Sequence, residues 1–367
     1  VYLLGEKEIK VSKYFSPLVA IIDKGISLST RQFIQFYKEK FFLVTGNGNI
    51  YVTSSHNENF SKIKLKKINS NLENLIGKEF LKEYPNNIMH FLVEDEKMYM
   101  SYLKKEDKEC YFAEILVADL DEDFIEFKKK IFSLDECNDV PGNPGGRLVS
   151  LNEHELLYTV GDAGKKHRPQ DMKSLYGKIL KINKKTGETN IFSLGLRNPE
   201  GLFNFKEKNI ILSTDHGPVG GDEVNFQKIK ENKLINYGWP MSSYGYHNTK
   251  NKEIIKKYPH YKSHYKYNFK EPLFHANEIS IPPTQIIVAN NFIKIKNNDV
   301  LYFGSLGWDV RDRQRSIHQL IVNEDDFKVY AHNIIPIDER IRDLAWDYNN
   351  NKIYFTYING IGIIELN

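Results

Sequence analysis

One pattern recurs along the chain: an aliphatic run, a polar turn, and then a β-branched or aromatic run. Each unit is typical of a β-hairpin with Gly, Asn, Asp or Glu at its tip. Successive units begin about 50 to 60 residues apart, with one longer interval, and about six of them fit the chain. The units are FFLVTGNGNIYVTS from Phe41, MHFLVEDEKMYMSYL from Met89, GRLVSLNEHELLYTVGD from Gly146, GLFNFKEKNIILSTDHG from Gly201, TQIIVANNFIKIKNNDVLYFGSL from Thr284 and IRDLAWDYNNNKIYFTYING from Ile341.

Short-strand repeats with this period favour an all-β fold, a six-bladed β-propeller, built as a single domain over residues 1–367. The longer interval, residues 242–278, is expected to be an insertion on one face that lines a binding site. Helical periodicity is scarce, and predicts short helices only at Leu72–Leu81 and Asp123–Lys130. A pair of β-sandwiches is the alternative, but no linker divides the chain near its midpoint.

The composition argues against several classes of protein. The net charge is +3 and the Lys and Arg residues are scattered among acids, so no nucleic-acid surface is expected. The one basic patch, Tyr258–Lys270, is expected to be a solvated loop. The sequence has no run of about 18 apolar residues, so no membrane span is predicted. Because the chain begins with Val1, a removed signal, anchor or tag before it stays open.

The chain has two cysteines, Cys110 and Cys137. They fit either a disulfide in an oxidising compartment or two reduced thiols in the cytosol, and the sequence leaves both open.

Three short segments contain residues suited to binding. Asp222 and Glu223 follow a Gly pair, and adjacent carboxylates near backbone carbonyls suit calcium, although a surface acidic pair that caps a turn is the commoner outcome. Arg197 precedes Asn198 and a proline, so its backbone is extended or turned. The third segment is RIRD, whose Arg340 and Arg342 share a face if it is a strand, and such a pair suits carboxylates or phosphates. An ion pair with a neighbouring acid is the alternative there.

The sequence has no G-x-S-x-G, H-E-x-x-H, P-loop or C-x-x-C motif. His260 and His264 are four residues apart, but Pro259 favours an irregular loop, and we expect both side chains to be exposed.

Several segments occur in an order that is more specific than any one of them: GGRL, GD, YGKILKIN, GLRNPEGL, HGPVGGDEVN, NYGWP and RIRD. This series resembles the glucose/sorbosone dehydrogenase family of soluble quinoprotein aldose sugar dehydrogenases. The resemblance runs from Phe41 to the C-terminus and is strongest between Gly145 and Pro240. It implies a six-bladed propeller that binds pyrroloquinoline quinone (PQQ) and calcium and oxidises a sugar, with a histidine that takes the proton while hydride passes to the quinone. It also implies a periplasmic or extracellular protein.

The resemblance assigns roles to particular residues. The ligands of a structural calcium ion fall on Glu223 and Tyr237, with Asp222 adjacent. The carbonyls that hold a calcium ion at the cofactor fall on Gly217 and Pro218. The cofactor-binding side chains fall on Arg197, Asn198, Arg340 and Arg342.

The resemblance fails at the catalytic turn. The family reads His-x-Gly-Gly-Arg-Leu, and this chain has Asn143 in the place of the histidine. Asparagine can hydrogen-bond a sugar hydroxyl but cannot accept a proton near neutral pH. A general base typically contributes about 100- to 10,000-fold, so activity is expected to fall to a trace. His216 is a possible substitute base, although the family also carries histidine there.

Looser alignments place three further family positions at Pro85 or a neighbour, Gly307 and Ala276, where this chain lacks the family's glutamine, lysine and aromatic residue. Three hypotheses follow. The first is a divergent quinone-dependent sugar oxidoreductase. The second is a non-catalytic, calcium-stabilised propeller that binds a glycan or a protein partner through its tyrosine-rich insertion. The third is a lactonase-like hydrolase, but the sequence has no pair of histidines in a suitable motif for one.

Overall fold

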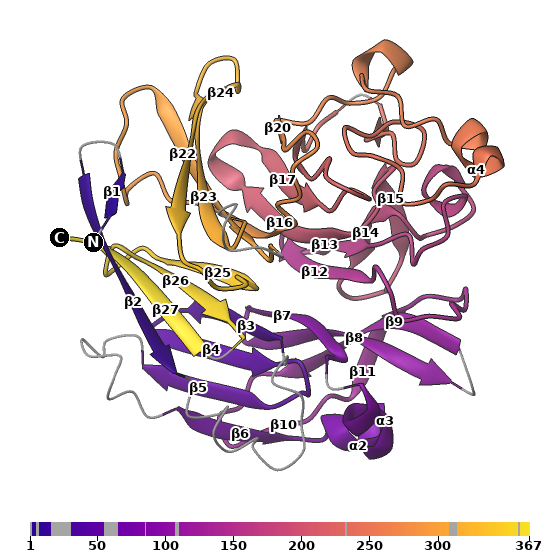
Figure 1. Ribbon diagram of the computed structural model, residues 1–367. Helices are drawn as coiled ribbons and strands as arrows, with labels where there is room; N and C mark the ends of the chain where they lie inside the picture. The colour runs from indigo at the N-terminus through magenta and orange to yellow at the C-terminus, as the bar shows by residue number, and fades with distance from the viewer. Residues whose placement is uncertain are drawn as a thin grey trace. The chain divides into compact units, whose positions relative to one another are not determined.

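The computed structural model describes residues 2–4, 7–15, 31–54, 65–84, 86–106, 110–231, 233–307, 314–358 and 360–367. These residues form six sheets, and the fold is the predicted six-bladed β-propeller (Figure 1). By their contacts the residues fall into two compact units. The first contains Val1–Met100, Leu116–Lys129 and Ile287–Asn367, and the second contains Ser101–Ile115 and Lys130–Ile286. That all 367 residues form a single domain remains a prediction.

Each sheet follows the chain with little crossover. Three sheets, in hydrogen-bonding order, are β1 (Tyr2–Leu4), β2 (Lys7–Phe15), β27 (Gly360–Leu366), β26 (Lys352–Tyr357) and β25 (Asp343–Asp347); β10 (Phe124–Ile125), β6 (Lys66–Ser70), β5 (Ile50–Ser54), β4 (Lys40–Thr45) and β3 (Gln32–Tyr37); and β11 (Lys129–Ser133), β9 (Cys110–Asp119), β8 (Lys97–Glu106) and β7 (Ile88–Glu94). The other three are β12 (Gly145–Ser150), β13 (Glu155–Val160), β14 (Lys178–Asn183), β15 (Thr189–Leu194) and β19 (Ile235–Asn236); β16 (Pro199–Phe205), β17 (Ile210–Asp215), β18 (Glu223–Lys228) and β20 (Phe274–His275); and β21 (Pro283–Val288), β22 (Asn298–Ser305), β23 (Ser316–Asn323) and β24 (Val329–Pro336).

All six predicted hairpins are confirmed. They correspond to the strand pairs β4–β5, β7–β8, β12–β13, β16–β17, β21–β22 and β25–β26. The tips have the backbone that such turns need, since Asp95 and Glu96, between β7 and β8, both have positive φ. In the first unit, the N-terminal strand β2 pairs with β27 near the C-terminus, so two ends of the chain complete one sheet.

Helices are few. The helix predicted over Leu72–Leu81 is present as α2 (Leu72–Ile76) and α3 (Lys78–Glu83), which Gly77 separates. The helix predicted over Asp123–Lys130 is wrong, because Phe124 and Ile125 instead pair with β6 as the short strand β10. The remaining elements are α4 (Lys252–Lys257), η2 (Arg168–Gln170), η3 (Lys206–Lys208) and η4 (Tyr265–Tyr267). None of the helices in the described ranges is long and apolar enough to span a membrane.

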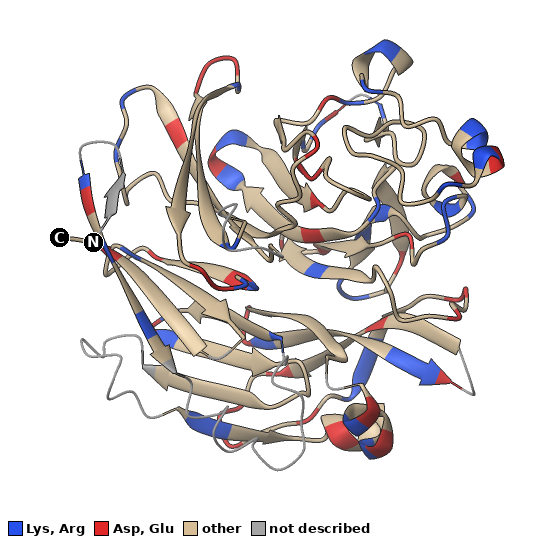
Figure 2. Ribbon diagram, in the orientation of Figure 1, with Lys and Arg blue, Asp and Glu red and all other residues tan. Residues whose placement is uncertain are grey.

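Each unit has an apolar core between its sheets. In the first unit, a cluster joins β3 and β4 with β25, β26 and β27; it contains Ile34, Phe41, Leu43, Ala345, Tyr354, Ile361 and Ile363. In the second unit, a cluster joins strands of the β12–β15 and β16–β18 sheets; it contains Leu157, Ile179, Leu196, Leu202, Ile211, Ile235 and Tyr237. Figure 2 shows basic and acidic residues interspersed along the ribbons, in keeping with the mixed charge pattern of the sequence.

The close packing of β26 and β27 generates a stability prediction. Gly362 lies opposite Phe355, and a Cβ on Gly362 would meet Phe355 Cζ at 1.9 Å. We expect Gly362→Ala to lower the free energy of unfolding by about 1–3 kcal/mol, because the buried ring must move. Gly142→Ala is the control, since a Cβ there meets nothing within 4 Å. Equal denaturation midpoints for the two variants would contradict the packing.

Candidate functional site

The turn that carries Asn143 has the tight backbone that its glycines and prolines predict. Asn143 lies in the left-handed region with φ 46°, and Gly145 follows with φ 66°. A Cβ on Gly145 would meet Thr159 O at 2.9 Å, so the turn packs directly on β13 and only glycine fits there. The turn therefore fixes where residue 143 lies, whatever its side chain.

The Asn143 side chain is bound to a buried carboxylate. Asn143 Nδ2 donates to Asp162 Oδ1 at 2.9 Å, and Gly164 N donates to the same oxygen at 2.8 Å. Asp162 Oδ2 accepts a third bond, from Trp239 Nε1 at 2.9 Å. Asp162 is only 1% exposed. Its carboxylate holds together the turn, the indole and the GDAG segment, residues Gly161–Gly164. The Asn143 amide offers no proton acceptor.

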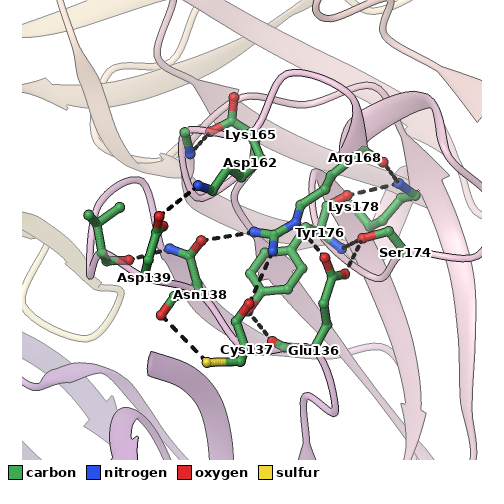
Figure 3. Close-up of polar contacts among 12 residues, drawn as sticks. Glu136, Cys137, Asn138, Asp139, Asp162, Lys165, Arg168, Ser174, Tyr176 and Lys178 are labelled. Carbon is green, nitrogen blue, oxygen red and sulfur yellow. Dashed lines mark hydrogen bonds and ion pairs between the residues drawn. The ribbon is translucent and has the colours of Figure 1, made fainter. Parts of the chain in front are cut away.

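The segment before this turn is held by a buried arginine (Figure 3). Arg168 Nε donates to Glu136 Oε1 at 2.7 Å, and its Nη1 donates to Asn138 Oδ1 at 3.0 Å. Burial lowers the pKa of Lys178 to about 8, and its Nζ donates to three backbone carbonyls.

Cys110 and Cys137 are paired in a disulfide. This decides between the disulfide and the two reduced thiols that the sequence left open.

Arg197 and Asn198 are brought to the same turn. Their backbone N–H groups donate to Asp215 Oδ2 and Oδ1 at 2.8 and 2.6 Å. Burial raises the pKa of Asp215 to about 8, although these two hydrogen bonds oppose the shift. Asn198 Oδ1 accepts from Gly145 N at 3.2 Å, so the predicted cofactor residue also supports the catalytic turn.

Both ring nitrogens of His216 have hydrogen-bond partners. Its Nε2 lies 2.8 Å from the Pro283 carbonyl oxygen, and its Nδ1 lies 3.3 Å from Asn198 Nδ2. Because a carbonyl only accepts, Nε2 carries the hydrogen and the Nδ1 lone pair accepts from the amide. His216 therefore has no spare lone pair with which to replace a base at position 143.

Cations and imidazoles surround the indole of Trp239. Lys166 Nζ lies 5.7 Å and Arg197 Cζ 5.8 Å from the ring centre. The His260 ring is 5.0 Å from Trp239 and stacks on His247 at 3.7 Å. Trp239 is hydrogen-bonded to Asp162, which also binds Asn143. The cations and the aromatic face therefore lie beside Asn143 and Asp162.

His260 is buried, and so is His264, so the expectation that both are exposed was wrong. They are 3% and 1% exposed. Burial, with help from His247 and nearby cations, lowers the pKa of His260 to about 3. Neither ring nitrogen of His260 has a hydrogen-bond partner among the described residues. Unpartnered buried polar atoms beside cations and an aromatic face suit a planar, anionic ligand, so this donor set fits a quinone carboxylate such as PQQ carries.

The predicted ligands of a structural calcium ion are engaged with protein groups. Asp222 Oδ1 accepts from Gly217 N at 2.9 Å and its Oδ2 accepts from Ile281 N at 2.7 Å. Glu223 Oε1 lies 3.1 Å from His264 Nε2. Burial alone would lower the pKa of His264, but the charge of Glu223 raises it. Both Asp222 oxygens and Glu223 Oε2 accept from protein N–H groups, so these two carboxylates do not fit a calcium ion. The described residues contain no group of three or more His, Cys, Asp or Glu side chains that could hold a metal.

Gly217 and Pro218 form the turn before β18. A Cβ on Gly217 would meet Gly220 O at 2.0 Å, so the turn leaves no room for a side chain at this position. The role of their carbonyls toward a cofactor cation remains a prediction.

Arg340 and Arg342 lie in the first unit. They line a cavity of about 170 Å³ together with Arg31, which no sequence motif singled out. Arg340 Nη1 donates to Gly307 O at 3.2 Å, and burial, together with Arg315, lowers the pKa of Arg340. Their binding of a cofactor remains a prediction, as do the looser alignments at Gly307 and Ala276. Pro85 lies outside the described residues.

The model of the family described as Glucose / Sorbosone dehydrogenase matches residues 88–364. The chain belongs to the glucose/sorbosone dehydrogenase family. A curated relative, aldose sugar dehydrogenase YliI of Escherichia coli (strain K12), is 32% identical over 114 residues, which are 28% of this chain and 30% of that protein. The chain therefore matches less than a third of the length of that relative.

Two solved structures share the fold. One is the soluble aldose sugar dehydrogenase of Escherichia coli in the apo-form, with a TM-score of 0.69, 18% identity, and coverage of 98% of this chain and 99% of that one. The other is the PQQ-bound form of aldose sugar dehydrogenase from Streptomyces coelicolor, with a TM-score of 0.63, 14% identity, and coverage of 99% and 100%. The family fold is thus kept by a chain that carries Asn143 in the turn before β12.

The burial of His260 predicts a pH dependence of stability. Folded His260 stays neutral down to about pH 3, whereas the unfolded chain takes up its proton below about pH 6.5. The unfolded state then binds one proton more, so the free energy of unfolding falls as the pH falls, by at most about 1.4 kcal/mol per pH unit. We expect His260→Asn, which tolerates the positive φ, to make this slope shallower between pH 6.5 and 4.

The control is His154→Asn, because the His154 side chain is exposed. Denaturant unfolding at several pH values measures both slopes. The free energy of unfolding of both variants could fall with pH as steeply as that of the unmodified protein. In that case His260 does not take up a proton on unfolding, although its burial requires it to do so.

Proposed function

We propose that this chain is a PQQ-binding member of the glucose/sorbosone dehydrogenase family that has lost most of its sugar-oxidising activity. One observation carries the proposal: the residue at the position of the family's base is Asn143, whose amide is bound to the Asp162 carboxylate at 2.9 Å. The turn, the carboxylate and the indole beside it are intact, but the proton acceptor is absent.

The chain's own residues supply binding and orientation. Arg197 and Lys166 would neutralise carboxylates of the quinone, and Trp239 offers an aromatic face to its ring. A calcium ion at the cofactor would be held by the carbonyls of Gly217 and Pro218, as the resemblance implies. When bound, the quinone supplies the hydride acceptor.

The proton of the sugar hydroxyl has no acceptor at this turn. Asn143 can accept a hydrogen bond through Oδ1 but remains neutral. The tautomer of His216 is fixed by Pro283 and Asn198, so that ring does not take over the proton. The loss of general-base catalysis lowers the turnover by about 100- to 10,000-fold.

Binding is tested by calorimetric titration of PQQ into the calcium-loaded protein. We expect saturable binding that Lys166→Gln weakens by about 10- to 100-fold, the equivalent of one charge-assisted contact. Lys165→Gln is the matched control, because Lys165 instead pairs with Asp139 at 2.9 Å. Absence of binding at high micromolar quinone would overturn the proposal.

Catalysis is tested by restoring the base. We expect Asn143→His to raise aldose oxidation by about 100-fold or more, because Asp162 is placed to accept a hydrogen bond from the new ring and orient it. Asn143→Gln, which adds no proton acceptor, should give no gain. High activity in the unmodified protein, unchanged by Asn143→His, would contradict the assignment of Asn143.

A second candidate function is suggested by the insertion at 242–278. Its side chains include Tyr265, 80% exposed, and Tyr246, 50% exposed, and Tyr261 stacks on Tyr267 at 3.7 Å. Exposed tyrosines suit sugar stacking or protein contacts. A glycan array probed with the protein, and with a Tyr265→Ala variant as comparison, tests this function; glycan binding without PQQ binding would favour it.

We also propose a periplasmic or extracellular location. The support is the Cys110–Cys137 disulfide, since disulfides persist in oxidising compartments.

A further inference from the structure

His264 lies in the irregular segment between β19 and β20. It belongs to the 242–278 insertion, where it precedes η4, and it is buried. Gly238, in the NYGWP segment, has no side chain, and the His264 ring occupies the space beside it. A Cβ on Gly238 would lie 2.9 Å from His264 Nδ1. The ring of Tyr244 covers it at 5.1 Å. The segment thus folds back and places one imidazole against Glu223, the first residue of β18.

The imidazole contacts a predicted calcium ligand directly. His264 Nε2 lies 3.1 Å from Glu223 Oε1, and Asn225 Nδ2 donates to the other carboxylate oxygen at 3.2 Å. Neither ring nitrogen of His264 makes a well-directed hydrogen bond within the described residues, so the contact with Glu223 is one of close packing at ion-pair distance. A buried carboxylate requires a compensating partner, and here a side chain of the same unit provides it.

The geometry leaves little for a calcium ion. Calcium takes about six to eight oxygens at about 2.3–2.6 Å. Both oxygens of Asp222 already accept backbone N–H groups, and a ring nitrogen of His264 lies 3.1 Å from Glu223 Oε1. The ring therefore occupies space beside that oxygen that a calcium ion would need.

We propose that the His264 imidazole takes the place that the family resemblance gives to a structural calcium ion at Glu223 and Tyr237, so that this region folds without calcium. The inference concerns the structural position alone. It is independent of whether PQQ binds, because a cofactor cation would lie at the Gly217 and Pro218 carbonyls.

The test is thermal unfolding of the quinone-free, full-length protein in calcium and in EDTA. We expect the unmodified protein to unfold at the same temperature in both. His264→Gly, which empties the space beside Glu223, should unfold at a lower temperature in EDTA and regain several degrees in calcium. His318→Gly is the matched control: His318 is equally buried but pairs with His332 instead of a carboxylate, so calcium should not rescue it.

The Glu223→Gln variant decides the remaining outcomes, even if His264→Gly fails to fold. A calcium-induced rise in the unfolding temperature of the unmodified protein that Glu223→Gln abolishes would overturn the proposal. A rise that survives Glu223→Gln arises at another site and upholds it. Because no quinone is present, each result is separate from the PQQ titration.

Discussion

The hydrogen bonds to the Asp162 carboxylate organise the candidate site. They join the Asn143 turn, the GDAG segment and Trp239, which lies 77 residues further along the chain. Because the carboxylate is buried, loss of it would leave donors unsatisfied, at about 1–3 kcal/mol each. The same three bonds hold the turn in place with asparagine at position 143. An amide bound in this way supports the turn but cannot accept a proton.

Local features of the fold could be predicted from the sequence. All six hairpins follow from hydrophobic runs and polar tips, which act over a few residues. The helix expected at Asp123–Lys130 was wrong because Phe124 and Ile125 pair with Asn69 and Ser70, and a distant partner strand leaves no local signal. The ordered motifs singled out Asn143, Arg197 and Glu223, but they did not show which groups those side chains contact.

The histidines of the insertion show the same limit. Pro259 and the surrounding Tyr and Lys residues favour an exposed loop, and much of that loop is exposed or partly exposed. The loop nevertheless turns His260 toward Trp239 and His264 toward Glu223, and both rings are buried. Lys166 likewise gave no signal, because its role depends on an indole that the fold brings near. Family membership fixes the scaffold, while the chemistry depends on these individual contacts.

We propose that the quinone-binding face survives without its proton acceptor, and the absorbance of protein-bound PQQ after rapid mixing with an aldose tests this. Because Asn143 leaves the sugar proton without an acceptor, the bound quinone is expected to stay oxidised for many seconds. Complete reduction at a typical enzymatic rate, about 10 per second, would contradict it, because another group would then be taking the proton that Asn143 cannot accept.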